Sequence, residues 1–327
     1  MPSASDTDYH GKSAAHQFFD ASDWFSAQAG LAPELARAAF ALGRLDGAVA
    51  ALEPEAQAGA NRRLALIEVE AMLWAQGTPL RREEIGRDLM EARAGADLEA
   101  MRLARWGIRR LEGQGDPRDL RGFLGLHRAA VSGLDELLAT RPTGRDFDAA
   151  VDEFRDLAGQ VAGLAPLVRA AALRVLWRLC GLSAPEVLAE PATWTARDMA
   201  EGCEALRFVP LGRHGRAVWV DAGPPAERMA RHLAAVTAAI MDARHELARV
   251  ADWQARALAA MAGVKGDNPG RVIRALAAHP LLNAAMLEDS AGISRDTAER
   301  MLARMKALGL AREITGGRRF RLWMLAG

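Results

Sequence analysis

Residues 281–325 constrain the fold more than any other stretch, because they carry, in order, the signals of a helix, a tight turn, a second helix and a hairpin. Gly292, in Ala291-Gly292-Ile293, lacks a side chain and so suits a sharp turn between helices. Ser294 is a good N-cap for the second helix, and Asp296 lies favourably at its positive end. This order predicts a winged helix-turn-helix.

The second helix of this stretch has one apolar stripe, and a two-stranded wing is expected after it. The stripe recurs at steps of three and four residues and consists of Ala298, Met301, Leu302, Met305 and Leu308. Gly309 ends the helix. Leu310 to Ile314 and Phe320 to Leu325 then flank Thr315 to Arg319, whose glycine pair suits a hairpin turn.

Charge separates this module from the rest of the chain. Residues 265–327 contain 11 Lys or Arg against 6 Asp or Glu, a net charge of +5, whereas the whole chain sums to zero. Residues 1–264 therefore carry −5. A basic C-terminal module is the electrostatic footprint expected of phosphate binding. The alternative is a small packing module whose arginines only solvate it.

Double-stranded DNA is the partner that this module predicts, because a helix-turn-helix inserts the start of its second helix into the major groove. The residues expected to contact base edges are Arg295, Thr297, Glu299 and Arg300. The residues expected to contact phosphate are Ser294, Arg304, Lys306, Arg318, Arg319 and Arg321. Two acids lie on the face expected to contact bases. Asp296 could interact with the positive end of the helix dipole, and Glu299 could pair with a neighbouring arginine.

Composition predicts a mainly α-helical protein with a multi-helix body. The 327 residues are 50% hydrophobic and 26% charged, ordinary values for a globular chain, and include a single tyrosine. No run of about 18 apolar residues occurs and the polar start lacks a signal-peptide core, so we expect a cytoplasmic protein without a membrane partner. Cys180 and Cys203 are too few for a disulfide scaffold or a four-cysteine metal site.

Turn signals divide the chain into five regions. These are a flexible leader at 1–16, an N-terminal helical region at 17–118, a central helical domain at 119–262, a linker at 263–270 and the winged helix-turn-helix at 271–327. Within the central domain, two short apolar runs around Gly212 to Gly215 predict a small β-hairpin near 206–221.

Helical periodicity and caps predict the elements of the body. Two amphipathic helices contain Leu35 to Leu45 and Leu64 to Trp74, and Gly77-Thr78-Pro79 ends the second. Further helices are expected at 81–93, 96–112, 119–139, 147–163 and 166–180, with a short one capped by Thr195. Pro224-Pro225 opens a long helix to Met261, which could also supply a homodimer surface.

Residues 269–327 closely resemble the C-terminal helix-turn-helix domain of an uncharacterised group of alphaproteobacterial, often plasmid-borne proteins. The ending Arg319-Phe320-Arg321-Leu322-Trp323 is especially similar, and residues 120–262 resemble the companion domain, which has no assigned function. The resemblance implies DNA binding. One departure is Glu288, at a position where many such units have a small residue, so its side chain must project outward.

A weaker resemblance is to Fic proteins, which transfer nucleotide monophosphate to hydroxyl groups and often end in a winged helix. Ala41 to Gly47 and Glu70 to Gly77 are similar to the helical N-terminal region of that family. Its His-Pro-Phe and Gly-Asn-Gly-Arg motifs are not reproduced, since the only His-Pro is His279-Pro280 and no glycine-rich loop follows. Met72 and Gln76 would occupy the serine and glutamate places of its inhibitory motif.

No other catalytic, cofactor or metal site is predicted. His245-Glu246 begins like a zinc-protease helix, but Arg249 replaces the second histidine. His127 and His232 are isolated histidines that are expected to be packed or solvated. The tryptophans on the predicted helices are expected to fill the core or contacts between helices, and they are Trp74, Trp106, Trp177 and Trp253.

The sequence therefore favours a DNA-binding protein, with transcriptional regulation as its role and an unidentified effector or protein partner for the acidic body. The first alternative is a non-catalytic protein-interaction scaffold derived from a Fic-like ancestor. The second is an enzyme with an unrecognised helical active site.

Overall fold

The computed structural model describes residues 14–90, 97–126, 141–220, 222–315 and 321–326. The chain is mainly helical with one small antiparallel sheet near its C-terminus, as the sequence predicts. The helices of the body are α1 (Ala14–Phe18), α2 (Ala21–Gly30), α3 (Ala32–Ala50), α4 (Pro54–Gln76), α5 (Arg82–Leu89), α6 (Leu98–Leu111), α7 (Leu120–Leu124), α9 (Gly144–Gln160), α10 (Pro166–Leu179), α11 (Ala189–Met199), the 3₁₀ turn η1 (Gly212–His214), α12 (Arg216–Trp219) and α13 (Pro225–Met261).

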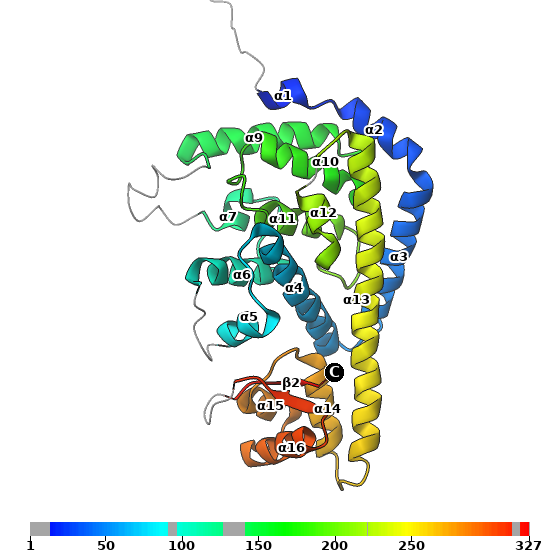
Figure 1. The fold of residues 1–327 in the computed structure, drawn as a ribbon, viewed down its shortest axis with the longest axis vertical. Coiled ribbons are helices and arrows are strands. Elements are labelled where there is room, and N and C mark those ends of the chain that lie inside the picture. The colour runs from blue at the N-terminus through cyan, green and yellow to red at the C-terminus, as the bar shows by residue number, and fades with distance from the viewer. Residues whose placement is uncertain (1–13, 91–96, 127–140, 221, 316–320, 327) are drawn as a thin grey trace, which may run out of the picture.

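The 37-residue helix α13 runs along most of the length of the molecule (Figure 1). Helix α3 packs along one side of it, and α2 and α10 contact it toward its N-terminal end. The long helix predicted from Pro224-Pro225 is confirmed, since α13 begins at Pro225 and ends at Met261. Proline suits the first helical position because it has no amide hydrogen to leave unpaired. The C-terminal part of α13 reaches past the body to the C-terminal module.

The C-terminal module comprises α14 (Asn268–Ala278), α15 (Ala284–Ala291), α16 (Arg295–Ala307) and the strands β1 (Ala311–Glu313) and β2 (Trp323–Leu325). The strands are antiparallel, with Ala311 opposite Leu325 and Glu313 opposite Trp323. A further bridge joins Leu282 to Trp323 through two backbone hydrogen bonds of 3.0 and 2.8 Å. The order is that of a winged helix-turn-helix.

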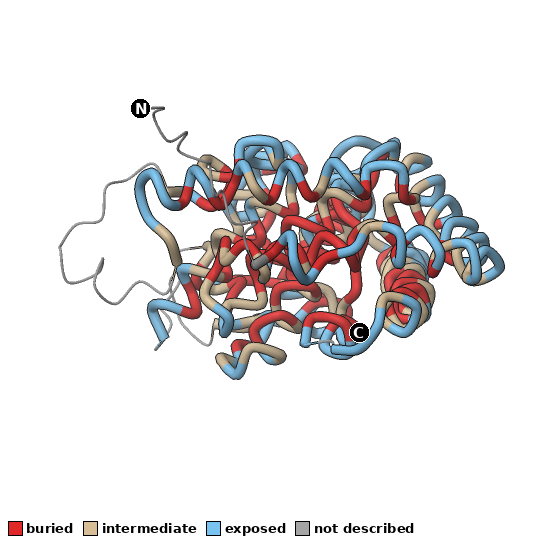
Figure 2. The backbone as a smooth tube through the Cα atoms, turned by 90° about the horizontal axis from the view of Figure 1, so that it is seen from above, coloured by how far each residue is buried: buried red, intermediate tan, exposed pale blue. Residues whose placement is uncertain are grey.

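Two apolar clusters stabilise the chain, and α13 contributes to both. The larger cluster lies in the body, where buried residues gather in the middle of the molecule (Figure 2). The smaller cluster joins Trp253, Ala257 and Met261 of α13 to the apolar faces of α14, α15 and α16. The indole Nε1 of Trp253 also donates a 2.8 Å hydrogen bond to the Leu310 carbonyl, so this tryptophan is buried and paired.

The predicted hairpin near 206–221 is wrong. Of these residues the structure describes 206–220, which form an extended segment, η1 and α12. In a hairpin, backbone amides of this segment would donate to carbonyls of the partner strand. Here they have other acceptors: Val209 N donates to Ala196 O, and Leu211 N and Gly212 N donate to the Glu68 carboxylate. An apolar run with turn residues therefore fits buried irregular chain as well as a strand.

Three local predictions also need correction. Thr195 lies inside α11, where its hydroxyl donates to Pro191 O, so it is not an N-cap. Trp74 is 58% exposed and does not fill the core. The helix expected at 119–139 stops at Leu124 because Gly125 adopts φ +76°, and residues 127–139 lie outside the described chain.

The connection between α13 and α14 spans residues 262–267, so residues 268–270 of the expected linker are helical. Most of the expected leader, residues 1–13, lies outside the described chain. No helix in the described part is long and apolar enough to cross a membrane.

Candidate functional site

The turn between α15 and α16 has the predicted geometry. Gly292 adopts φ +60°, a conformation in which a side chain would be strained, and its amide donates to Glu288 O. Ser294 caps α16, with its hydroxyl 3.4 Å from the Thr297 amide nitrogen. Glu288 is exposed, as its position required. These contacts hold the start of α16 at a fixed angle to α15.

The residues predicted to read bases lie on the outer face of α16, but its arginines already have partners. Arg295 pairs with Glu299 at 3.4 Å, and Arg300 pairs with Asp296 at 3.2 Å. Thr297 is half-buried between them. Exposed pairs one helical turn apart are weak, so a stronger anion could displace the acids. The face itself carries mixed charge.

The residues predicted to contact phosphate are less uniform. Arg304 and Arg321 are exposed, whereas Lys306 is 3.7 Å from the Glu313 carboxylate and lies over the Trp323 ring. The Ser294 hydroxyl is engaged in its cap. Arg318 and Arg319 lie outside the described residues. Of the predicted phosphate contacts, Arg304 on α16 and Arg321 before β2 are therefore exposed. The Lys306 ammonium instead lies beside Glu313 and Trp323 of the two strands.

The opposite side of the module is docked on the body. Arg312 of β1 pairs with Glu83 at 2.7 Å, and His279 lies 3.0 Å from Glu55. Helices α4 and α14 approach so closely that a Cβ added at Gly59 would lie 1.6 Å from Ala278 O. As Figure 1 shows, α16 lies on the side of the module away from the body. Its outer face is left open to a partner.

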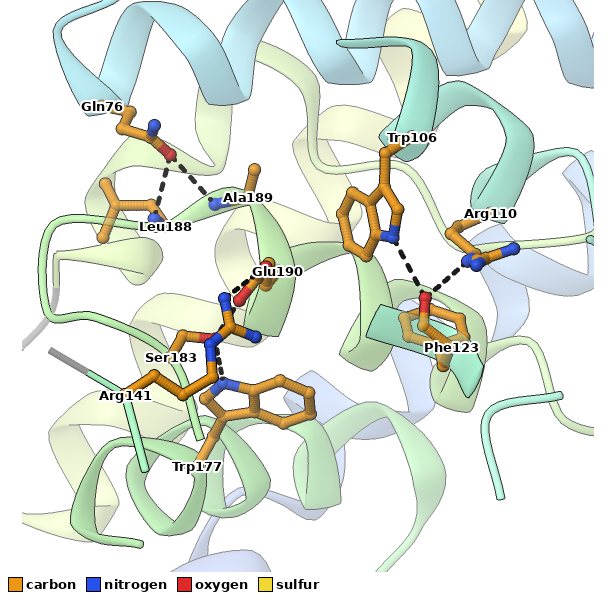
Figure 3. A network of polar contacts seen from close by, with 10 residues as sticks. All are labelled: Gln76, Trp106, Arg110, Phe123, Arg141, Trp177, Ser183, Leu188, Ala189 and Glu190. Carbon is orange, nitrogen blue, oxygen red and sulfur yellow. Dashed lines mark hydrogen bonds and ion pairs between the residues drawn. The ribbon is translucent and has the colours of Figure 1, made fainter. Parts of the chain in front are cut away.

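Inside the body, the first amides of two helices bind side-chain carbonyl oxygens. Gln76 Oε1 accepts from Leu188 N at 3.1 Å and from Ala189 N at 3.3 Å, at the start of α11 (Figure 3). Gln28 Oε1 accepts from Ala165 N at 2.8 Å, before α10. A helix N-terminus binds anions through such amides. Here glutamine side chains take that place.

A buried polar chain fixes the connection between α10 and α11 (Figure 3). The Trp177 indole donates to Ser183 Oγ at 2.8 Å, the Ser183 hydroxyl donates to Glu190, and Arg141 pairs with Glu190 at 3.0 Å. Sequence reasoning missed this chain, because its members match no motif and Arg141 lies 49 residues before Glu190. The one available signal was Glu190, an acid in the first turn of α11.

Two buried titratable groups are Glu68, which the sequence did not single out, and His232, which was expected to be packed or solvated and is packed. Burial raises the pKa of Glu68 to about 7, against the hydrogen bonds from the Gly212 and Leu211 amides. His232 is fully buried with Nδ1 3.0 Å from Arg174 Nη2. Burial first, and the Arg174 charge second, lower the pKa of His232 well below its ordinary value, so the ring is neutral.

The remaining histidines considered do not form a metal site in the described part of the chain. His245 is exposed on α13, and His127 lies outside the described residues. No group of three His, Cys, Asp or Glu side chains within the described ranges is placed to hold a metal ion. Cys180 is buried, and burial raises its pKa to about 12.

The helical architecture matches one known fold over nearly its whole length. A crystal structure of a Fic family protein from Desulfovibrio desulfuricans G20 superposes with a TM-score of 0.52 at 14% sequence identity, covering 91% of this chain and 96% of that one. The chain has a Fic-like fold. No family model and no curated protein matches the sequence.

The Fic-like fold includes the C-terminal module, since the match spans nearly the whole of both chains. At this identity the similarity describes the path of the backbone only. Activity and partners must be argued from the residues of this chain.

Proposed function

We propose that this chain is a non-catalytic binding protein on a Fic-like fold, and that the outer face of α16 binds a protein partner. The carrying observation is the placement of α16, whose face is open while the opposite side of the module is held on the body through Arg312 and His279. A rigid body that holds one helix face outward suits a scaffold.

The absence of catalysis is proposed on two grounds. The Gly-Asn-Gly-Arg loop associated with nucleotide transfer does not occur in the sequence, and the only His-Pro is His279-Pro280. His279 pairs with Glu55 in the contact between module and body. Moreover, the Ala165 amide before α10 binds Gln28, and the Leu188 and Ala189 amides at the start of α11 bind Gln76.

A protein partner is favoured over DNA by the charge pattern of α16. Its acids and arginines alternate in pairs one turn apart, so the face offers both signs to a partner. Phosphate groups would be repelled by Asp296 and Glu299 unless the arginines reorganise. Charged pairs of mixed sign set the specificity and orientation of protein contacts.

Duplex DNA is the second candidate, supported by the net charge of +5 over residues 265–327 and by the capped, exposed start of α16. In that case Arg295 and Arg300 would leave their acids for base edges or phosphates. Binding would weaken steeply as salt rises.

A photo-crosslinking residue at Ala303 would test the surface in cells of the source organism. Ala303 is exposed on α16, and Ala39 is a matched exposed alanine on α3. We expect a protein adduct at Ala303, absent at Ala39 and lost when Arg300→Ala is added. A nuclease-sensitive adduct would instead establish the DNA candidate, and equal labelling at both positions would refute the surface. A nucleotide-sized mass added after incubation with nucleoside triphosphates would refute the non-catalytic proposal.

A further inference from the structure

A pocket of about 320 Å³ lies where α3, α4, α13 and α14 meet. Its walls are mostly apolar and come from both the body and the C-terminal module. Residues that form these walls include Leu45, Leu52, Ala60, Leu247, Val250 and Ala277. The volume is at the lower end of the range for small-molecule sites, which are typically apolar with a few polar groups that orient the ligand.

Arg63 of α4 lines this pocket and is only 6% exposed. Within the described residues its guanidinium, which has five N–H donors, makes one hydrogen bond, from Nη2 to Ala277 O at 3.2 Å. No carboxylate in the described chain forms an ion pair with it. Burial lowers the pKa of Arg63 to about 10, with the Glu246 charge acting in the opposite direction. Burying a cation without a counter-ion costs free energy, because the charge loses its hydration, unless a bound anion compensates it.

A second arginine, Arg244 of α13, lines the same pocket and is half-buried. It too has no ion pair within the described ranges. Other buried or half-buried arginines of the body do pair with carboxylates, such as Arg169 with Asp198 and Arg141 with Glu190. Arg63 and Arg244 therefore place two guanidinium groups, neither in an ion pair with a described acid, beside an apolar chamber, which matches an anion with an apolar tail.

We propose that this pocket binds a small monocarboxylate, with its carboxylate on Arg63 and Arg244 and its aliphatic tail among the apolar walls. Guanidinium groups bind carboxylates through paired N–H donors, which also fixes the direction of the tail. The chamber suits a chain of several carbons. A neutral molecule of the same shape would leave the two charges uncompensated.

The ligand would also touch the contact between body and module. Ala277, which forms one wall, belongs to α14 and accepts the hydrogen bond from Arg63. A carboxylate on Arg63 would hold the guanidinium in place and tighten this contact. The pocket does not include α16, so ligand binding there does not depend on which partner α16 binds.

Calorimetric titration of the full chain with hexanoate tests the site, with 1-hexanol as the neutral probe of the same length. We expect hexanoate to bind at least ten-fold more tightly than hexanol and to slow amide hydrogen exchange at the C-terminal end of α14. Arg244→Gln should weaken hexanoate binding at least ten-fold. Arg256→Gln, which removes an exposed charge from the same helix outside the pocket, should leave binding unchanged.

Ala248→Phe provides a variant that fills the pocket from an exposed helical position and keeps both arginines. It should abolish binding while circular dichroism stays unchanged. Equal affinity for hexanoate and hexanol, equal loss in the Arg244 and Arg256 variants, or full binding by the Ala248 variant would each overturn the proposal. So would no heat of binding at millimolar hexanoate.

Discussion

At the residue scale, the polar groups that matter most are buried ones whose partners come from distant parts of the chain. Glu68 of α4 accepts hydrogen bonds from the amides of Leu211 and Gly212, more than 140 residues later, and so fixes the start of η1 against α4. The carboxylate is completely buried, and no cation among the described residues pairs with it. Protonation of Glu68 should therefore affect the stability of the segment around Leu211 and Gly212.

Glu68→Gln should make the protein more stable at pH 8. Burial raises the pKa of Glu68 from 4.5 to about 7, so the folded state binds this proton more tightly than the unfolded state. The resulting stability is full below pH 4.5 and is lost as the pH rises to about 7. A shift of this size corresponds to about 3 kcal/mol at most. Urea unfolding at pH 5 and pH 8 would measure it.

Glutamine keeps an oxygen that can accept both amide hydrogen bonds and cannot ionise, so the variant should show a flatter pH dependence. Glu53→Gln is the control, because Glu53 is exposed at the start of the same helix. It should follow the wild-type profile. Identical pH profiles for Glu68→Gln and the wild type would show that Glu68 is not the source.

At the element scale, short-range sequence signals determine where α16 begins and which face is buried. Long-range packing determines which elements surround it. The turn glycine and the serine cap have the predicted roles, since Gly292 turns and Ser294 caps. Of the predicted stripe, Ala298, Leu302 and Met305 are buried and Met301 is half-buried, but Leu308 at the C-cap is 46% exposed. Such signals act through backbone conformation and helix periodicity. The ion pairs on the outer face also follow from spacing.

Ser294→Ala should loosen the start of α16 without changing the rest of the fold. Loss of the cap leaves an amide of the first turn without its partner, at a cost of about 1 kcal/mol. Hydrogen exchange at the Thr297 amide should accelerate by roughly five-fold. Ser290→Ala, at an exposed residue of α15 that is not a cap, is the control. Equal acceleration in both variants would contradict the role of Ser294.

At the scale of the whole molecule, α13 joins two apolar clusters, and the contact between α4 and α14 sets how the module lies on the body. Gly59 is decisive there, because Ala278 O occupies the space of its missing side chain. The homodimer surface suggested for α13 stays a prediction. Its exposed apolar residues include Met241 and Leu258.

Gly59→Ala should destabilise the docked arrangement, although alanine normally favours a helix over glycine by about 1 kcal/mol. The new Cβ would overlap a backbone oxygen, so α14 must move away, and we expect a loss of more than about 2 kcal/mol. Limited proteolysis in residues 262–267 should become faster. Gly47→Ala on α3, where nothing lies within 4 Å, is the matched control and should be neutral or stabilising.

The sequence by itself determined the helical class, the long helix from Pro225, and the turn, cap and stripe of the C-terminal module. Each depends on neighbours a few residues apart, for which periodicity and backbone preference are sufficient guides. It did not exclude a strand at 206–211, because buried irregular chain and strand share the same apolar pattern. It also placed Trp74 in a core that this side chain does not reach.

Only the tertiary structure decided which distant residues meet. Three contacts show this: Gln76 with the start of α11, the polar chain from Trp177 to Arg141, and Arg63 with α14. Each joins segments more than 35 residues apart in the sequence. No local preference encodes such contacts, since they arise from the packing of whole helices. That packing also leaves α16 open and gives the pocket two arginines that form no ion pair with an acid of the described residues.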